Sequence, residues 1–66
     1  SAEWKAQVGS DALVAWPVNY AETGVNTFVV THAGIVYEKD LGPDTEAIVK
    51  GVARFNPDKT WNVVGE

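Results

Sequence analysis

The sequence predicts an α+β fold: a small antiparallel β-meander of three to four strands with one helix packed on it. Runs rich in β-branched residues alternate with short turns that contain glycine in the first part of the chain. An apolar stripe at helical spacing follows a glycine–proline break. With 66 residues the chain can form one domain at most. We expect residues 1–10 to form an N-terminal arm and residues 11–66 to form that domain.

The first predicted strand lies in the apolar run "DALVAWPVNY", residues 11–20. Pro17 falls inside this run, and proline has no N–H to donate to a neighbouring strand. We therefore expect residues 12–20 to form a strand at the edge of the sheet, or one that ends or bulges at the proline. The segment "AETGVN", residues 21–26, predicts the turn that follows, centred on Gly24.

Two more strands are predicted after this turn. "NTFVVTH" is rich in β-branched and aromatic residues, and "HAG" is a short connection in which Gly34 can adopt a positive φ. "GIVYEKD" then places Ile35 and Tyr37 on one face of a strand and Val36 and Glu38 on the other. Strands joined by loops of a few residues indicate an antiparallel meander.

A helix is predicted after Gly42 and Pro43 interrupt the strand pattern. We expect Asp44 to be the N-cap of a helix that begins near Thr45, with Gly42 in a conformation that disfavours a side chain. Glu46 then lies in the first turn, where the helix dipole favours negative charge. An apolar stripe at spacings of i, i+4 and i+7 is expected to pack on the sheet, and it consists of Ile48, Val52 and Phe55.

The end of the chain is predicted to be short and extended. Asn56-Pro57 stops the helix, and "PDKT" forms a turn. "TWNVV" then predicts a short last strand, or an extended tail anchored by Trp61.

Composition excludes several classes of function. The net charge is −4 and the five basic residues are spread singly, so the chain lacks the basic footprint that nucleic-acid binding needs. The longest apolar stretch, residues 12–18, is far too short to span a bilayer, so we expect no membrane insertion by this chain. The chain has no cysteine and one histidine, which argues against a structural metal, and we expect no cofactor.

Acidic residues gather between positions 38 and 46, and they allow calcium binding, carboxylate-based hydrolysis or helix capping: Glu38, Asp40, Asp44 and Glu46. No EF-hand spacing is present, and a sheet with one helix has little room for a cleft. His32 lies beside a predicted hairpin turn, and the two serines are at positions 1 and 10, so a catalytic triad is not expected. We predict no metal site, no catalytic residue and no enzyme activity.

The tryptophans allow two interpretations. Trp4, Trp16 and Trp61 can form the core of a small domain, or they can stack on sugars or on a protein partner. The predicted edge strand and the arm before it offer unpaired backbone groups to another chain. We therefore predict a partner-contact surface made of Trp4, Val8, Leu13, Trp16 and Pro17. If the contact lies elsewhere, we expect the outer sheet face with Val29, Val36 and Glu38 to form it.

Two resemblances extend this interpretation. "ALVAWPVNYAETGVNTFVVTHAGIVYEKDLGPDTEAIV" together with "RFNPDKTW", within residues 11–64, resembles the C-terminal part of an uncharacterised family of secreted bacterial proteins, and "YEKDLGPDT" is a fairly specific block. Members of that family carry a large additional N-terminal part. The segment "WPVNYAETGVNTFVVTHAGIVYEKD" is also similar to the last sheet of type IV pilin and pseudopilin head domains. Neither resemblance supplies catalytic residues.

These observations lead to an expected function. The resemblances imply an extracytoplasmic protein, whether secreted, periplasmic or at the cell surface. We expect a non-catalytic structural or assembly module, such as a pilin-like filament subunit or its globular part. Its partner would be a protein, either a second copy or a companion chain. The alternative is a cell-envelope binding domain that recognises a peptide or a glycan.

Overall fold

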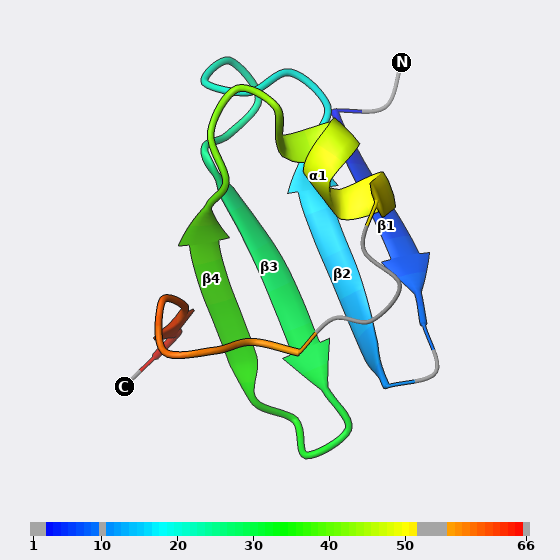
Figure 1. Ribbon diagram of the computed structural model, residues 1–66, viewed down its shortest axis with the longest axis vertical. Helices are drawn as coiled ribbons and strands as arrows, with labels where there is room; N and C mark the ends of the chain where they lie inside the picture. Colours follow the sequence, from blue (N-terminus) through cyan, green and yellow to red (C-terminus); the bar gives the residue numbers. More distant parts are fainter. Residues whose placement is uncertain (1–2, 10, 52–55, 66) are drawn as a thin grey trace.

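The computed structural model describes residues 3–9, 11–51 and 56–65 of the chain. They form one five-stranded antiparallel sheet in which every strand pairs with its neighbour in sequence, β1-β2-β3-β4-β5 (Figure 1). The strands are β1 (Trp4–Val8), β2 (Ala12–Pro17), β3 (Asn26–Thr31), β4 (Val36–Asp40) and β5 (Asn62–Val63). The helix, α1, spans Thr45–Gly51. The predicted fold class, an antiparallel meander with one helix, is therefore confirmed.

The position of β2 corrects the prediction of an edge strand. β2 lies inside the sheet, paired with β1 from Trp4↔Pro17 to Val8↔Leu13 and with β3 from Ala12↔Thr31 to Ala15↔Phe28. The segment predicted as an arm supplies the edge strand instead, because Trp4–Val8 is β1.

Pro17 is accommodated because it is the last residue of β2. The amide of Val18 donates to the carbonyl of Glu3 in the β1 direction (3.0 Å), so the nitrogen of Pro17 faces β3 by the alternation of a strand. The β2–β3 ladder has already ended at Ala15↔Phe28, so no ladder hydrogen bond is lost there. The proline therefore ends the strand, which was one of the predicted alternatives.

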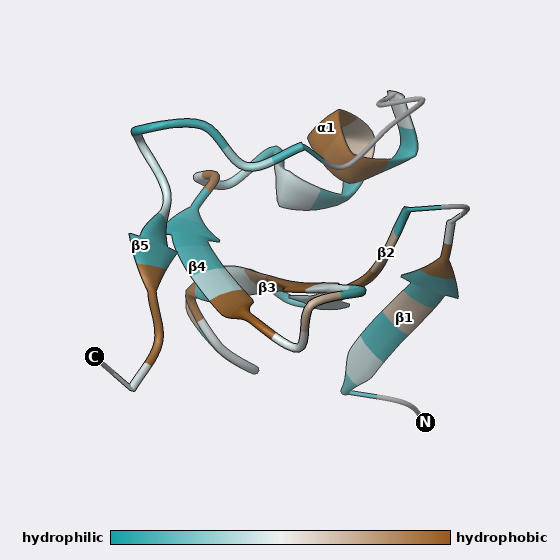
Figure 2. Cartoon of the chain, turned by 90° about the horizontal axis from the view of Figure 1, so that it is seen from below, coloured by the Kyte–Doolittle hydropathy of each residue, from teal (hydrophilic) through white to brown (hydrophobic). Residues whose placement is uncertain are grey.

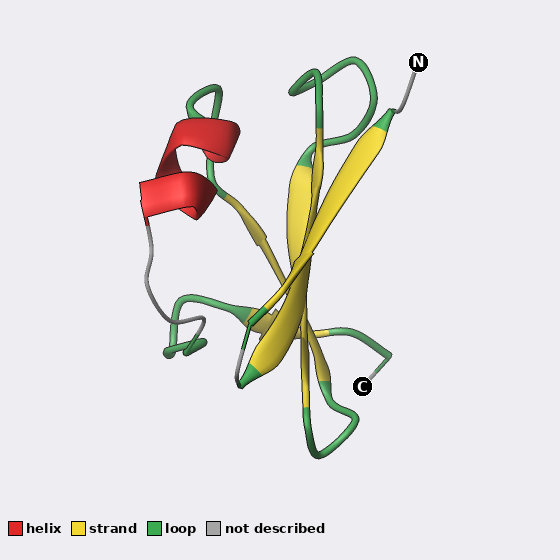
Figure 3. Cartoon of the chain, turned by 90° about the vertical axis from the view of Figure 1, so that its right-hand side faces the viewer, coloured by secondary structure: helices red, strands yellow, loops and turns green. Residues whose placement is uncertain are grey.

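Helix α1 covers one face of the sheet, and its side of the sheet holds the core (Figure 3). Alternate residues of β2 point to this side, and the buried apolar residues of the core are Ala12, Val14, Trp16, Val29 and Val49. Leu41 and Trp61 pack against this cluster and are partly buried. Trp16 and Trp61 thus contribute to the core, whereas Trp4 is 41% exposed.

The face that α1 presents to the sheet differs from the predicted stripe. The buried helix residues are Thr45 and Val49, whereas Ile48 is 41% exposed. The other two members of the predicted stripe, Val52 and Phe55, lie outside the described residues. Thr45 can be buried because its hydroxyl donates to the carbonyl of Gly42 (2.5 Å), which satisfies the polar group inside the protein.

The turns follow the predicted glycines. Gly34, between β3 and β4, has a φ of 83°, and Gly42, before α1, has a φ of 84°. Both values lie in the left-handed region, where a Cβ atom is disfavoured. The expectation for these two positions is confirmed.

Candidate functional site

The side of the sheet opposite α1 carries apolar side chains from four neighbouring strands. Figure 2 shows α1 on one side of the sheet, whereas no helix is drawn on the other side. The register of the four longer strands places apolar side chains side by side on this second surface. We call it the open face and define it by six exposed or half-buried residues: Trp4, Val8, Leu13, Phe28, Val30 and Val36.

Trp4 is held on the open face by two neighbours. Its ring lies 6.0 Å from that of Phe28, with the two planes tilted by 44°. It also covers Gly24, where an added Cβ would stand 2.7 Å from Cζ2 of the indole. The turn glycine therefore makes room for the tryptophan, and the aromatic pair is a fixed feature of this surface.

The predicted contact residues are divided by the fold. Trp4, Val8 and Leu13 are 41%, 81% and 38% exposed, and all three lie on the open face. Trp16 is 3% exposed beneath α1, and Pro17 is fully buried. Neither can offer surface to another molecule, because each is covered by the chain itself. The alternative contact surface predicted from the sequence, Val29, Val36 and Glu38, is also split between the two faces of the sheet. Val29 is buried under α1, whereas Val36 and Glu38 lie on the side away from α1.

Phe28 and Val30 were not singled out from the sequence. The alternation in "NTFVVT" puts Thr27 and Val29 on one face and Phe28 and Val30 on the other. Both faces are partly apolar, so the pattern could not indicate which one the helix covers.

The acidic residues of the 38–46 segment are used separately. Glu38 accepts a hydrogen bond from Asn26 Nδ2 (2.8 Å), and Asp40 accepts hydrogen bonds from Tyr20 Oη (2.7 Å) and from the amide of Gly42 (2.8 Å). The hydrogen bond to Asp40 raises the pKa of Tyr20 above its ordinary value, because it favours the protonated phenol. Within the described part of the chain, no three acidic or histidine side chains gather as metal ligands would.

Asp44 occupies the N-cap position through its backbone. Its carbonyl accepts the hydrogen bond from the amide of Ile48 (3.0 Å), which is the first α-helical bond. Among the described residues its carboxylate has no hydrogen-bond partner. The side-chain interactions at the start of the helix come from Asp40 and Thr45 instead.

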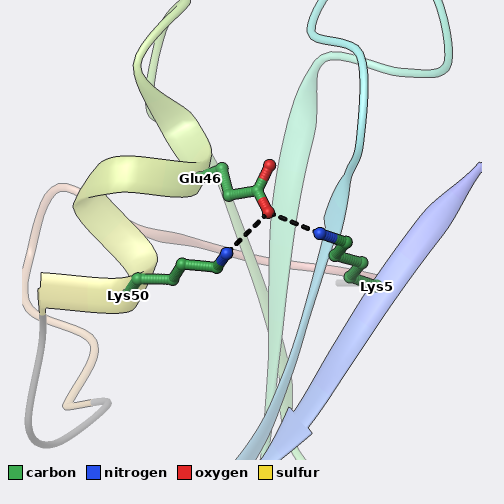
Figure 4. Close-up of polar contacts among 3 residues, drawn as sticks. All are labelled: Lys5, Glu46 and Lys50. Carbon is green, nitrogen blue, oxygen red and sulfur yellow. Dashed lines mark hydrogen bonds and ion pairs between the residues drawn. The ribbon is translucent and has the colours of Figure 1, made fainter.

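A three-residue ion cluster ties α1 to β1 on the covered side of the sheet (Figure 4). Glu46 Oε1 lies 2.7 Å from Lys5 Nζ and 3.1 Å from Lys50 Nζ. The hydrogen bond from Lys5 is the main cause that lowers the pKa of Glu46 below its ordinary value, followed by the hydrogen bond from Lys50. The cluster therefore positions the edge strand relative to the helix.

None of the helical residues that the structure describes forms a segment long and apolar enough to cross a bilayer. No curated protein and no solved structure matches the chain significantly. A family model, by contrast, matches almost all of it. Since that model covers residues 4–64, the chain belongs to the family described as "Protein of unknown function (DUF2950)".

Proposed function

We propose that this chain is a non-catalytic assembly module that packs its open face and its β1 edge against another protein. One observation carries the proposal: a five-stranded sheet has its helix on one face and apolar side chains across the other. Single exposed apolar residues are common on proteins, but contiguous apolar patches mark interaction sites. Val8 is 81% exposed, and fully burying an exposed valine side chain is worth about 1.5–3 kcal/mol, so a partner that covers it has a clear gain.

The local chemistry supports binding over catalysis. Glu38, Asp40 and Glu46 are each engaged by a different partner, namely Asn26, Tyr20 and Lys5. The finer proposal is that the module is extracytoplasmic and assembles into a pilin-like filament. A filament needs contact surfaces that propagate, and the chain offers two different ones, the β1 edge and the open face.

Site-specific photo-crosslinking in the native gene product tests the proposal. A crosslinking amino acid replaces Leu13 on the open face, and the matched control replaces Ile48 on the outer side of α1. The two side chains are similarly exposed, at 38% and 41%. We expect an intermolecular protein adduct from position 13 and none from position 48. An adduct confined within one polypeptide, or equal yields at both positions, contradicts the proposal.

A second candidate function is a cell-envelope binding domain. The observation that favours it is the exposed Trp4 ring beside Phe28, since exposed aromatic rings can stack on sugars as well as on proteins. In that case the chain is a monomer, and a soluble peptidoglycan fragment changes its tryptophan fluorescence in a saturable way. Trp4→Ala removes this response if the second candidate is correct.

A further inference from the structure

We infer that the partner of the β1 edge is a second copy of the chain, joined by antiparallel pairing of two β1 strands centred on Ala6. The inference rests on the proposed function, because it names the partner of one of the two contact surfaces proposed there. It follows from the direction of the backbone groups, the register that these groups allow, and the difference between the two edges of the sheet.

The hydrogen-bonding direction of β1 is fixed by its two ends. The carbonyl of Glu3 accepts from Val18 N (3.0 Å), and the amide of Gly9 donates to the carbonyl of Ala12 (2.8 Å). Backbone groups alternate in direction along an antiparallel strand, so odd-numbered residues of β1 face β2. Trp4, Ala6 and Val8 therefore direct their N–H and C=O groups away from β2, along the outer edge of the sheet.

These outward groups are self-complementary. With Ala6 opposite Ala6 of the second copy, Trp4 lies opposite Val8 of that copy, and all three pairs can exchange backbone hydrogen bonds. Lys5 then lies opposite Gln7 of the second copy, so no like charges face each other directly. The ammonium group of Lys5 is in addition engaged by Glu46 of its own chain.

Side chains gain from the same register. Trp4 and Val8 both lie on the open face, and Val8 is 81% exposed in the single chain. Pairing places each Val8 beside the indole of the other copy, and aromatic–β-branched cross-strand pairs are favourable. The paired chains then share one sheet, with five strands from each copy, and their two open faces form one continuous surface.

The opposite edge of the sheet, β5, is less suited than β1 to pairing with another strand. β5 has two residues, whereas β1 has five and contains no proline. Short edge strands, edge prolines and charged side chains, especially lysine, are the usual protection against pairing with another chain. β1 has neither of the first two, and its one charged residue, Lys5, is engaged by Glu46 of its own chain. Pairing of β1 with β1 is isologous, so it closes at a dimer.

Cysteine crosslinking tests the register directly, because the chain contains no cysteine. In the proposed pair the two Ala6 Cα atoms are about 5.5 Å apart, within the range that a disulfide spans. We expect Ala6→Cys to form a covalent dimer roughly tenfold faster than Gln7→Cys, whose side chain lies on the other face and off the two-fold axis. Equal rates, or a faster reaction of Gln7→Cys, overturn the inference.

Sedimentation of the unmodified chain and of Ala6→Pro provides the second measurement. Proline at position 6 removes the outward donor but no β1–β2 hydrogen bond. We expect a dimer for the parent chain at micromolar concentration and a folded monomer for the variant, with the fold checked by circular dichroism. If Ala6→Pro unfolds, the crosslinking rates of Ala6→Cys and Gln7→Cys and the sedimentation mass of the parent chain still test the inference. A monomeric parent overturns the inference.

The two proposals fail separately. If Ala6→Cys gives no preferred crosslink while position 13 still gives an adduct with a different protein, self-pairing is wrong and the assembly function stands. If position 13 gives no intermolecular adduct and the parent chain is monomeric, the proposed function itself is wrong.

Discussion

The carboxylate of Glu46 on α1 accepts a 2.7 Å hydrogen bond from Nζ of Lys5 on β1, although the two residues are 41 positions apart. Lys50, one helical turn after Glu46, lies 3.1 Å from the same oxygen. The helix and the edge strand are therefore held together by one carboxylate that two ammonium groups share. Its charge state decides whether this contact exists.

We expect this contact to make stability depend on acid pH. The folded protein lowers the pKa of Glu46 below its ordinary value of 4.5, so the stabilisation is present above that pH and is lost as the pH falls through the folded pKa. Glu46→Gln should lower the melting temperature at pH 7, and the difference from the parent chain should narrow below pH 4.5. Thermal unfolding followed by circular dichroism measures both.

Glu22→Gln is the matched control for this titration, because Glu22 is an exposed glutamate in the turn between β2 and β3. Because no described residue forms an ion pair with its carboxylate, the melting temperature of Glu22→Gln at pH 7 should stay close to that of the parent chain. If the difference in melting temperature between Glu46→Gln and the parent chain stays constant from pH 7 down to pH 3, the ion cluster contributes nothing to the pH dependence of stability.

The orientation of α1 makes a second prediction. Val49 is 2% exposed and belongs to the core, whereas its neighbour Ile48 is 41% exposed. Val49→Ala removes buried methyl groups and leaves a cavity, so it should cost about 2–3 kcal/mol. Ile48→Ala removes mostly exposed surface and should cost about 0.5 kcal/mol or less. Urea unfolding separates the two, and the reverse order would restore the originally predicted stripe.

The strands and their faces were largely predictable, because alternation and turn glycines are local signals. The strand of β1 was missed although Trp4, Ala6 and Val8 alternate with Lys5 and Gln7, since a five-residue pattern at the start of a chain is a weak signal. Missing β1 led to the wrong edge strand. Pro17 indicated a break in pairing correctly, but the sequence could not place that break at the end of an inner strand.

The helix face was predicted wrongly for a different reason. Ile48 and Val49 are adjacent and equally apolar, so spacing alone allowed either one to face the sheet. The residue that decides the orientation is Thr45, which is polar but is buried because its hydroxyl has a partner in Gly42. Such a local hydrogen bond is visible only in the folded chain. For the same reason, the sequence could not identify the open face, which depends on where the helix packs.

A third prediction concerns the space beneath Trp4. Gly24→Ala places a Cβ 2.7 Å from the indole, so the ring must shift from its present position beside Phe28. Overpacking of this kind typically costs about 1–3 kcal/mol, and the tryptophan emission should shift as the ring moves. Gly51→Ala is the control, because no described residue lies within 4 Å of a Cβ added there, and alanine at this position should stabilise by about 0.4–1 kcal/mol. An unchanged emission spectrum in Gly24→Ala would mean that Trp4 is not packed on the turn.

The last prediction separates the two acids at the start of the helix. Asp40 accepts hydrogen bonds from Tyr20 Oη and from the amide of Gly42, whereas the carboxylate of Asp44 has no hydrogen-bond partner among the described residues. Asp40→Ala should therefore cost about 1–2 kcal/mol, which corresponds to two hydrogen bonds of ordinary net strength. Asp44→Ala should cost only the interaction of its charge with the helix dipole, about 0.3–1 kcal/mol.

Two further variants show how much of the stability lost in Asp40→Ala comes from each of its two hydrogen bonds. Asp40→Asn keeps an acceptor oxygen, so it should retain more stability than Asp40→Ala. Tyr20→Phe removes only the phenol bond, so it should account for about half of the Asp40→Ala loss. Urea unfolding of the four variants gives the comparison. If Asp44→Ala costs more than Asp40→Ala, the side chain of Asp44 is the cap after all, because only a hydrogen bond that its carboxylate accepts from a first-turn amide would reverse the order.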